Sequence, residues 1–334
     1  MSGRYGAGSS LSLGAVETAG ESIGSSDWSA ERDRRDVLVG LDGSHASVVA
    51  LRWAAWFATA TRRRIRVAHA WQHGGGLEAV VAPPGQASDA EAFESAIEKR
   101  LRQLSVRELD DLDSVDAGVV AGCRALRGQV ASALVKEATR INAGLIAVGA
   151  RGSGGARRAL LGSVSRQLTE CPAQAVAVVP DDGFEPHGID WKALVGVDGS
   201  AGSSRALRWA AAAVRGRAEV VAVHAFEPPA HDLSKREVAS LAAEVQQRLE
   251  EEWCGPLRVR EVRYQAILDR GDARDVIGRA AAGVRPAFTV VGSRGLGPVS
   301  AKLLGSVTHH LVRTLDSPTV IVPSPRDCVD WDVS

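Results

Sequence analysis

The chain contains one pattern twice, and this internal repeat constrains its fold more than any other feature. Residues 37–44 read VLVGLDGS and residues 193–200 read ALVGVDGS. ALRWAA occurs at 50–55 and again at 206–211. Residues 144–180 and 287–323 share a second, glycine-rich pattern in the same order. Solenoid repeats have periods of about 20 to 50 residues, so this much longer period indicates a duplicated domain.

Within each copy, apolar runs alternate with segments of helical periodicity. The run at 37–41 is typical of a strand buried on both faces, and residues 47–60 place apolar side chains at helical spacing. Further strands are expected at 65–71, near 115–121, at 144–149 and at 175–179, and further helices at about 88–110 and about 128–142. This alternation predicts the α/β class, with two tandem doubly wound domains, each a parallel sheet covered by helices on both faces.

The repeat also sets the domain boundaries. Residues 1–35 are rich in Ser and Gly and are expected to form a disordered tail, with a regulatory arm as the alternative. The first domain is expected at 36–180, a linker at 181–190, the second domain at 191–324 and a short tail at 325–334.

Composition excludes several classes of protein. The 334 residues include 40 Lys and Arg and 40 Asp and Glu, so no net charge would attract nucleic acid or an anionic membrane. Four widely spaced cysteines form no C-x-x-C pair, which argues against a zinc site or a disulfide framework. Without a long apolar run or a secretory signal pattern, the sequence predicts a cytoplasmic protein.

Each copy carries glycines that are typical of a phosphate site. Gly149 ends an apolar run, Gly152 follows, and Gly162-Ser163 opens a helical pattern after nine residues. The second copy has the same spacing at Gly292, Gly295, Gly305 and Ser306. Glycine lets the backbone approach a ligand closely, and a helix start presents free N–H groups to an anion. The pattern therefore predicts half of a phosphate cradle in each copy.

A carboxylate is expected on the other side of each cradle. Asp42 and Asp198 follow the first strand of their copies. In an open doubly wound sheet, ligands bind beyond the carboxyl ends of the strands where the strand order reverses. If the strands of each sheet lie in the order 3-2-1-4-5, each aspartate faces its glycine loop across one crevice. The glycines lack the adjacent Lys-Ser or Lys-Thr of a Walker loop, and no G-x-G-x-x-G follows the first strand.

Both copies match the motif G-2x-G-9x-G-S/T at every defined position, and over roughly residues 36–324 the chain resembles a tandem universal stress protein with two UspA-type domains of the ATP-binding subgroup. The resemblance implies five-stranded sheets of order 3-2-1-4-5, related by a pseudo-twofold axis. It also implies ATP, together with Mg²⁺, in up to one site per domain.

Carried over by position, the resemblance implies particular nucleotide contacts. Asp42 and Asp198 would contact adenosine, and backbone groups of Ala70 and Ala225 would hold adenine. Ribose and phosphates would be surrounded by Gly149, Gly152, Gly162, Ser163, Gly292, Gly295, Gly305 and Ser306, with amides from Val164 and Val307. Positive charge could come from Arg151, Arg157, Arg158, Arg294 and Lys302, of which one or two could be solvated surface. The long loop at 72–87 could cover or obstruct the first adenine pocket.

Structural readings of the same residues remain open. The Asp-Gly-Ser turns could only cap the first helix of each domain, and Gly149 and Gly292 could only permit tight strand ends. His69 and His224 recur at equivalent positions and are interpreted as hydrogen-bonded scaffold. No catalytic or metal-binding residue is expected, because no general base or ligand cluster recurs in both copies.

The sequence therefore favours an ATP-binding stress-response module that regulates or binds other molecules. Two alternatives remain: a slow ATPase or related ATP-using enzyme, and a nucleotide-free dimerisation scaffold. Residues 175–179 and 319–322 are apolar edge candidates, and we expect them to pair within the chain. A dimer of tandem chains and a protein partner of unknown identity are also expected.

Overall fold

The computed structural model describes residues 35–72, 90–116, 118–152, 161–170, 174–182, 184, 188, 190–214, 217–228, 233–296 and 304–324. Strands and helices alternate in both halves, as the repeat predicts. The elements of the first half are β1 (Val37–Gly40), α1 (His45–Ala60), β2 (Ile65–Trp71), α3 (Ala90–Leu109), β3 (Val120–Arg127), α4 (Val130–Arg140), β4 (Leu145–Gly149), α5 (Ser163–Glu170) and β5 (Val176–Val179).

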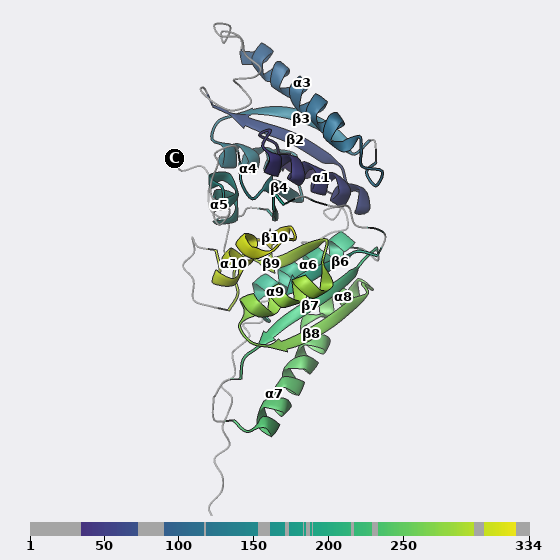
Figure 1. The fold of residues 1–334 in the computed structure, drawn as a ribbon, viewed down its shortest axis with the longest axis vertical. Helices are drawn as coiled ribbons and strands as arrows, with labels where there is room; N and C mark the ends of the chain where they lie inside the picture. The colour runs from purple at the N-terminus through teal and green to yellow at the C-terminus, as the bar shows by residue number, and fades with distance from the viewer. Residues whose placement is uncertain are drawn as a thin grey trace, which may run out of the picture.

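The second half repeats this order, with two short extra helical segments before its third strand. Its elements are β6 (Lys192–Gly196), α6 (Ala201–Val214), β7 (Glu219–Phe226), α7 (Lys235–Arg248), the π-helix η2 (Leu249–Trp253), α8 (Gly255–Val259), β8 (Tyr264–Arg270), α9 (Ala273–Val284), β9 (Phe288–Gly292), α10 (Ser306–Thr314) and β10 (Thr319–Val322). Figure 1 shows the two halves one above the other along the long axis, with α3 and α7 toward opposite ends.

All ten of these strands form one continuous sheet. Its order is β3-β2-β1-β4-β5-β10-β9-β6-β7-β8, so each half has the order third, second, first, fourth, fifth. The pairs within each half are parallel, whereas β5 and β10 pair antiparallel, with Val320 opposite Ala177. The α/β class and the duplicated parallel sheet are therefore confirmed, and the two edge candidates pair within the chain.

The buried side chains form two layers, one on each face of the sheet. One layer draws on α1, α3, α6 and α8, and the other on α4, α5, α9 and α10. Both layers contain residues from both halves, so the apolar core continues across the seam. This continuity gives the two halves a fixed relation to each other.

Aromatic rings fill the seam on the face covered by α1 and α6. The ring of Phe57 in α1 stacks on that of Trp209 in α6, with centroids 6.0 Å apart and planes 4° from parallel. Trp53 packs edge-on against Phe288 and donates a 3.3 Å hydrogen bond from Nε1 to the Ala287 carbonyl. Trp53 and Trp209 are thus core residues, as their helical spacing indicates.

The predicted position of the third strand was wrong. β3 spans Val120–Arg127, whereas a strand was expected near 115–121. β3 lies at the edge of the sheet, and most of its side chains are only half-buried. An edge strand of this kind tolerates the exposed side chains of Arg124 and Arg127, so it lacks the apolar run that marks the central strands. Within the described ranges, no helix is both long and apolar enough to cross a membrane.

Candidate functional site

Each half has a cavity at the carboxyl ends of its first two strands and its fourth strand. In the first half the cavity has a volume of ≈ 510 Å³, and in the second half ≈ 200 Å³. Its walls include eight of the residues that the sequence predicted for each half. The first set is Asp42, Ala70, Gly149, Arg151, Gly152, Gly162, Ser163 and Val164, and the second is Asp198, Ala225, Gly292, Arg294, Gly295, Gly305, Ser306 and Val307.

The aspartates are held at the mouth of these cavities by their own turns. Asp42 Oδ1 accepts hydrogen bonds from the Ser44 N–H at 2.9 Å and the Ser44 Oγ at 2.5 Å, while Ser44 caps α1. In the second half, Asp198 Oδ1 accepts a 3.0 Å bond from the Ser200 N–H. These turns therefore cap α1 and α6, and capping is compatible with a carboxylate that lines the cavity.

The two glycines of each strand end differ in what surrounds them. A Cβ at Gly149 would lie 2.7 Å from the carbonyl carbon and oxygen of Ala46, and one at Gly292 would lie 2.8 Å from the carbonyl carbon of Gly202. These glycines are required because the strand end packs directly on the start of α1 or α6. A Cβ at Gly152 or Gly295 would instead meet the Oδ2 atom of Asp42 or Asp198, at 2.9 or 2.3 Å. The second glycine of each pair thus borders the carboxylate.

Each cavity is also lined by the start of a helix with no acidic residue in its first turn. α5 begins at Ser163 and α10 at Ser306, and no side chain caps α10 at Gly305. The unpaired N–H groups and the helix dipole favour a negatively charged group at such a position. The site therefore combines a helix start, which favours an anion, with a carboxylate across the crevice.

The opposite wall of each cavity is apolar, and the sequence did not predict it. In the first half Val130 and Leu134 of α4 supply this wall, and in the second half Ala273 and Ile277 of α9 do so. The helical periodicity near 128–142 was the only available signal. An apolar wall opposite a polar one is typical of pockets that bind organic ligands.

Comparison with known proteins identifies the family. Residues 33–180 and 192–323 each match the universal stress protein family. The chain belongs to this family. A universal stress protein of Mycobacterium tuberculosis is 26% identical over 332 residues, which cover 90% of this chain and 98% of that protein. A second one from the same species is 29% identical over 315 residues, which cover 85% and 95%.

Solved structures show the same fold. A universal stress protein from Archaeoglobus fulgidus covers 87% of this chain and 98% of its own, with 20% identity and a TM-score of 0.57. A Pseudomonas aeruginosa protein of unknown function covers 90% and 96%, with 17% identity and a TM-score of 0.58. The tandem arrangement of two universal stress protein domains therefore has counterparts over nearly the whole chain.

The recurring histidines of the two universal stress protein domains are bonded to the sheet. Nδ1 of His69 lies 2.8 Å from the Leu41 carbonyl oxygen, and Nδ1 of His224 lies 2.7 Å from that of Val197. Because a carbonyl only accepts, Nδ1 must carry the proton in both rings. Burial lowers the pKa of His224 below its usual value, which favours a neutral ring at pH 7. These contacts agree with a scaffold role.

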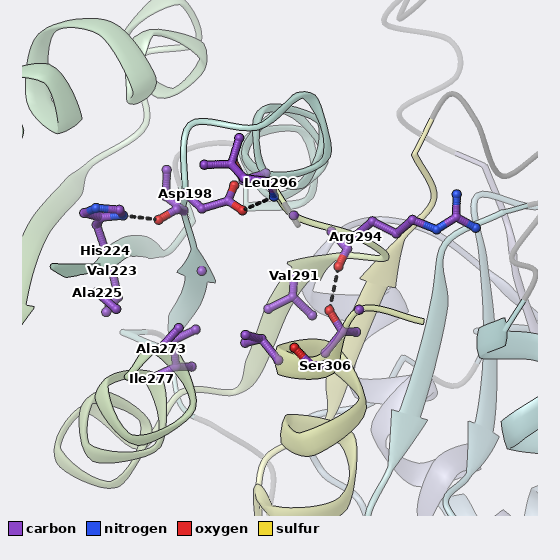
Figure 2. A pocket seen from close by; sticks show the side chains of 18 residues that line it. Asp198, Val223, His224, Ala225, Ala273, Ile277, Val291, Arg294, Leu296 and Ser306 are labelled. Atoms are coloured by element: carbon purple, nitrogen blue, oxygen red, sulfur yellow. Dashed lines mark hydrogen bonds between the residues drawn. The ribbon is translucent and has the colours of Figure 1, made fainter. Parts of the chain in front are cut away.

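The arginines of the glycine loops, Arg151 and Arg294, are among the residues that line the cavities. Arg151 forms an ion pair with Asp181, which follows β5. In Figure 2 the side chain of Arg294 extends away from Asp198, Ala225 and Ile277. A role for either arginine in phosphate binding stays a prediction. Arg157, Arg158 and Lys302 lie outside the described residues, as does the loop from 73 onward that was expected to cover the first pocket. Within the described ranges, no three His, Cys, Asp or Glu residues are placed to hold a metal ion.

Proposed function

We propose that each half binds an adenine nucleotide, ATP with Mg²⁺ in the first instance, and that the chain acts as a nucleotide-responsive binding module. The observation that carries this proposal is that a helix start and a carboxylate face each other across each cavity. The starts of α5 at Ser163 and of α10 at Ser306 lie across from the carboxylate of Asp42 or Asp198, with an apolar wall between them.

The chemistry of the walls matches the parts of a nucleotide. Phosphates fit the helix starts, because several N–H groups and the positive end of the helix dipole converge there. An uncharged adenine ring fits against Val130 and Leu134, or against Ala273 and Ile277. A ribose hydroxyl can donate a hydrogen bond to the aspartate. Mg²⁺ would accompany the phosphates as part of the ligand, since it is typically bound through substrate phosphates.

The same walls offer little for hydrolysis. Among the described residues that line the cavities, each histidine donates Nδ1–H to a backbone carbonyl, the remaining acceptor nitrogen of His69, Nε2, is buried, and the aspartates bond to their own turns. A group that activates water must have a proton acceptor within hydrogen-bond reach of it. We therefore expect ATP to act by binding rather than by hydrolysis. The bound nucleotide would change how the chain binds a protein partner or a second copy of itself.

The proposal is tested by blocking one cavity at a time. Gly152→Val and Gly295→Val each place a side chain against the aspartate of one site, so each variant should lose one ATP per chain in calorimetric titration. Wild-type protein at about 100 times the dissociation constant should gain roughly 2.7 kcal/mol of stability, or about 5 to 10 °C in Tm. Gly122→Ala and Gly278→Ala are matched controls, because a Cβ at either position meets nothing within 4 Å.

The alternatives give different outcomes. A nucleotide-free scaffold would show neither heat nor a Tm shift with ATP. A slow ATPase would release phosphate in proportion to occupied sites, and this release would fall in both glycine variants. Binding that survives in the double variant would contradict the assignment of the cavities.

A further inference from the structure

An indole ring lies on the turn that carries the carboxylate of the second cavity. A Cβ at Gly199 would lie 2.8 Å from Cε2 and Cζ2 of Trp253 and 3.1 Å from its Nε1, so the ring packs directly on the backbone of Gly199. Gly199 also has a φ of +78°, which glycine adopts without steric cost. Glycine therefore satisfies both the backbone conformation of the turn next to Asp198 and the ring that covers it.

Trp253 also contacts a histidine that lines the cavity. The rings of Trp253 and His224 meet edge to face, with centroids 5.0 Å apart and an interplanar angle of 68°. Nδ1–H of His224 donates a 2.7 Å hydrogen bond to the carbonyl of Val197, and Figure 2 shows this imidazole beside Asp198. The indole thus touches the residue after Asp198 directly, and it is linked to the residue before Asp198 through His224.

A π-helix fixes the position of this ring. η2 spans Leu249–Trp253, and the Cys254 N–H donates a 3.0 Å hydrogen bond to the Leu249 carbonyl, five residues back. Leu249 and Cys254 are fully buried in the core layer of α6 and α8. The guanidinium of Arg258 in α8 donates hydrogen bonds to two backbone carbonyls of η2, which holds the wide turn in place. Single π-helical turns are rare and occur frequently at functional sites.

A cation holds the same ring. The guanidinium of Arg248 lies over the indole of Trp253, with its Cζ 5.3 Å from the ring centroid. Arg248 also forms a 3.3 Å ion pair with Glu252 of η2. A guanidinium over an aromatic face is attracted by the electrons of the ring. The indole is therefore held in its place by Arg248 as well as by η2.

We propose that Trp253 is a positioning residue of the second nucleotide site, which holds the turn of Asp198 and the ring of His224 in the arrangement that receives the ribose. This inference rests on the proposed function, because it concerns how one of the two proposed sites is kept in shape. Trp253 acts through Gly199 and His224, and the nucleotide is bound by the residues that line the cavity.

The carboxylate moves with the turn that the ring covers. Asp198 Oδ1 accepts a 3.0 Å hydrogen bond from the Ser200 N–H, and Oδ2 accepts a 3.2 Å bond from the Leu296 N–H. A ribose hydroxyl must meet this carboxylate within a narrow range of distance and angle. Removal of the indole would leave a space beside Gly199, so the turn could shift and carry the carboxylate away from the ribose.

Calorimetric titration with ATP and Mg²⁺ tests the proposal in single-site chains. In the Gly152→Val background, which keeps the second site, Trp253→Ala should weaken ATP binding about tenfold, the effect of losing one hydrogen bond to a charged group. Trp253→Phe keeps a ring on the turn and should bind within about twofold of the parent chain. In the Gly295→Val background, which keeps the first site, Trp253→Ala should leave the affinity unchanged.

Leu257→Ala is the matched control, because it removes a fully buried side chain of α8 instead of the ring on the turn. It should lower stability and leave the ATP affinity of the second site unchanged. Equal affinities of Trp253→Ala and its parent at the second site would overturn the inference and leave nucleotide binding intact, and so would an equal loss at both sites. Absence of binding in wild type and in both single-site parents would overturn the proposed function as well.

A second variant approaches the same contact from the turn. Gly199→Ala places a methyl group where the indole lies, so in the Gly152→Val background it should also weaken ATP binding. It decides the matter if Trp253→Ala fails to fold, as checked by circular dichroism. Unchanged affinity in a folded Gly199→Ala variant would contradict the proposal.

The pKa of His224 provides a measurement without nucleotide. Burial is the main cause that lowers this pKa, Arg248 lowers it further, and Asp198 raises it. Loss of the indole would let water reach the imidazole, so Trp253→Ala should raise the pKa of His224 toward its usual value in an NMR titration, whereas Leu257→Ala should not. An unchanged pKa of His224 in folded Trp253→Ala would show that the indole does not hold this ring.

Discussion

Replacement of Ile321 by proline should lower the free energy of unfolding by about 5 kcal/mol or more. Ile321 is fully buried in β10 and pairs with Val176 of β5 on one side and Val291 of β9 on the other. Proline has no N–H, so it removes a donor from a strand that is paired along both edges. Loss of a large buried aliphatic side chain typically costs about 2 to 5 kcal/mol in addition.

Urea denaturation measures this effect, and Ile321→Val is the matched control. The valine variant keeps the backbone donor and loses one methylene group, so it should cost only about 1 kcal/mol. Because β10 joins the two halves of the sheet, the proline variant should also expose the seam. Trp53 and Trp209 should then lose their buried surroundings at a lower urea concentration than in the wild type. An unchanged urea midpoint for Ile321→Pro would show that β10 does not hold the halves together.

Substitution of Gly149 by valine should both destabilise the chain and abolish nucleotide binding in the first half. Its Cβ would lie 2.7 Å from backbone atoms of Ala46, which cannot rotate away as a side chain could. Overpacking of this kind typically costs about 1 to 3 kcal/mol. Because the strand end also forms the cavity wall, any shift that relieves the clash deforms the site.

Two measurements separate these effects. Thermal unfolding without ligand reports the clash, and ATP titration reports the site. Gly122→Ala in β3 should change neither, since a Cβ there meets nothing within 4 Å. If Gly149→Val were as stable as wild type, the close contact between β4 and α1 would not exist in solution.

Much of the fold could be predicted because the central strands carry continuous apolar runs. β2 begins and ends at Ile65 and Trp71, as expected, since it is buried along nearly its whole length. β3 could not be placed correctly, because an edge strand needs no apolar run and its register depends on β2. Edge strands are defined by their neighbours, which a local pattern does not reveal.

The candidate site, like the fold, could be predicted from the sequence only in part. The glycines and aspartates of each half meet because the first and fourth strands are parallel neighbours whose carboxyl ends lie at one edge of the sheet, which the sequence implied only together with the strand order of the family. The apolar wall from Leu134 and Ile277 depends on how α4 and α9 pack. The close packing of Ala46 and Gly202 on the strand ends at Gly149 and Gly292 likewise joins positions far apart along the chain. Motif spacing predicts a ligand class, whereas tertiary contacts set the shape of each cavity.

The most direct test of the account is a crystal structure of the chain grown with ATP and Mg²⁺. We predict density for a nucleotide in the first half, with its phosphates at the Gly162-Ser163 helix start and its ribose beside Asp42. The second half should hold a nucleotide at Gly305-Ser306 in the same way. Cavities that stay empty of nucleotide at saturating ATP, or that are filled by side chains in both halves, would contradict it.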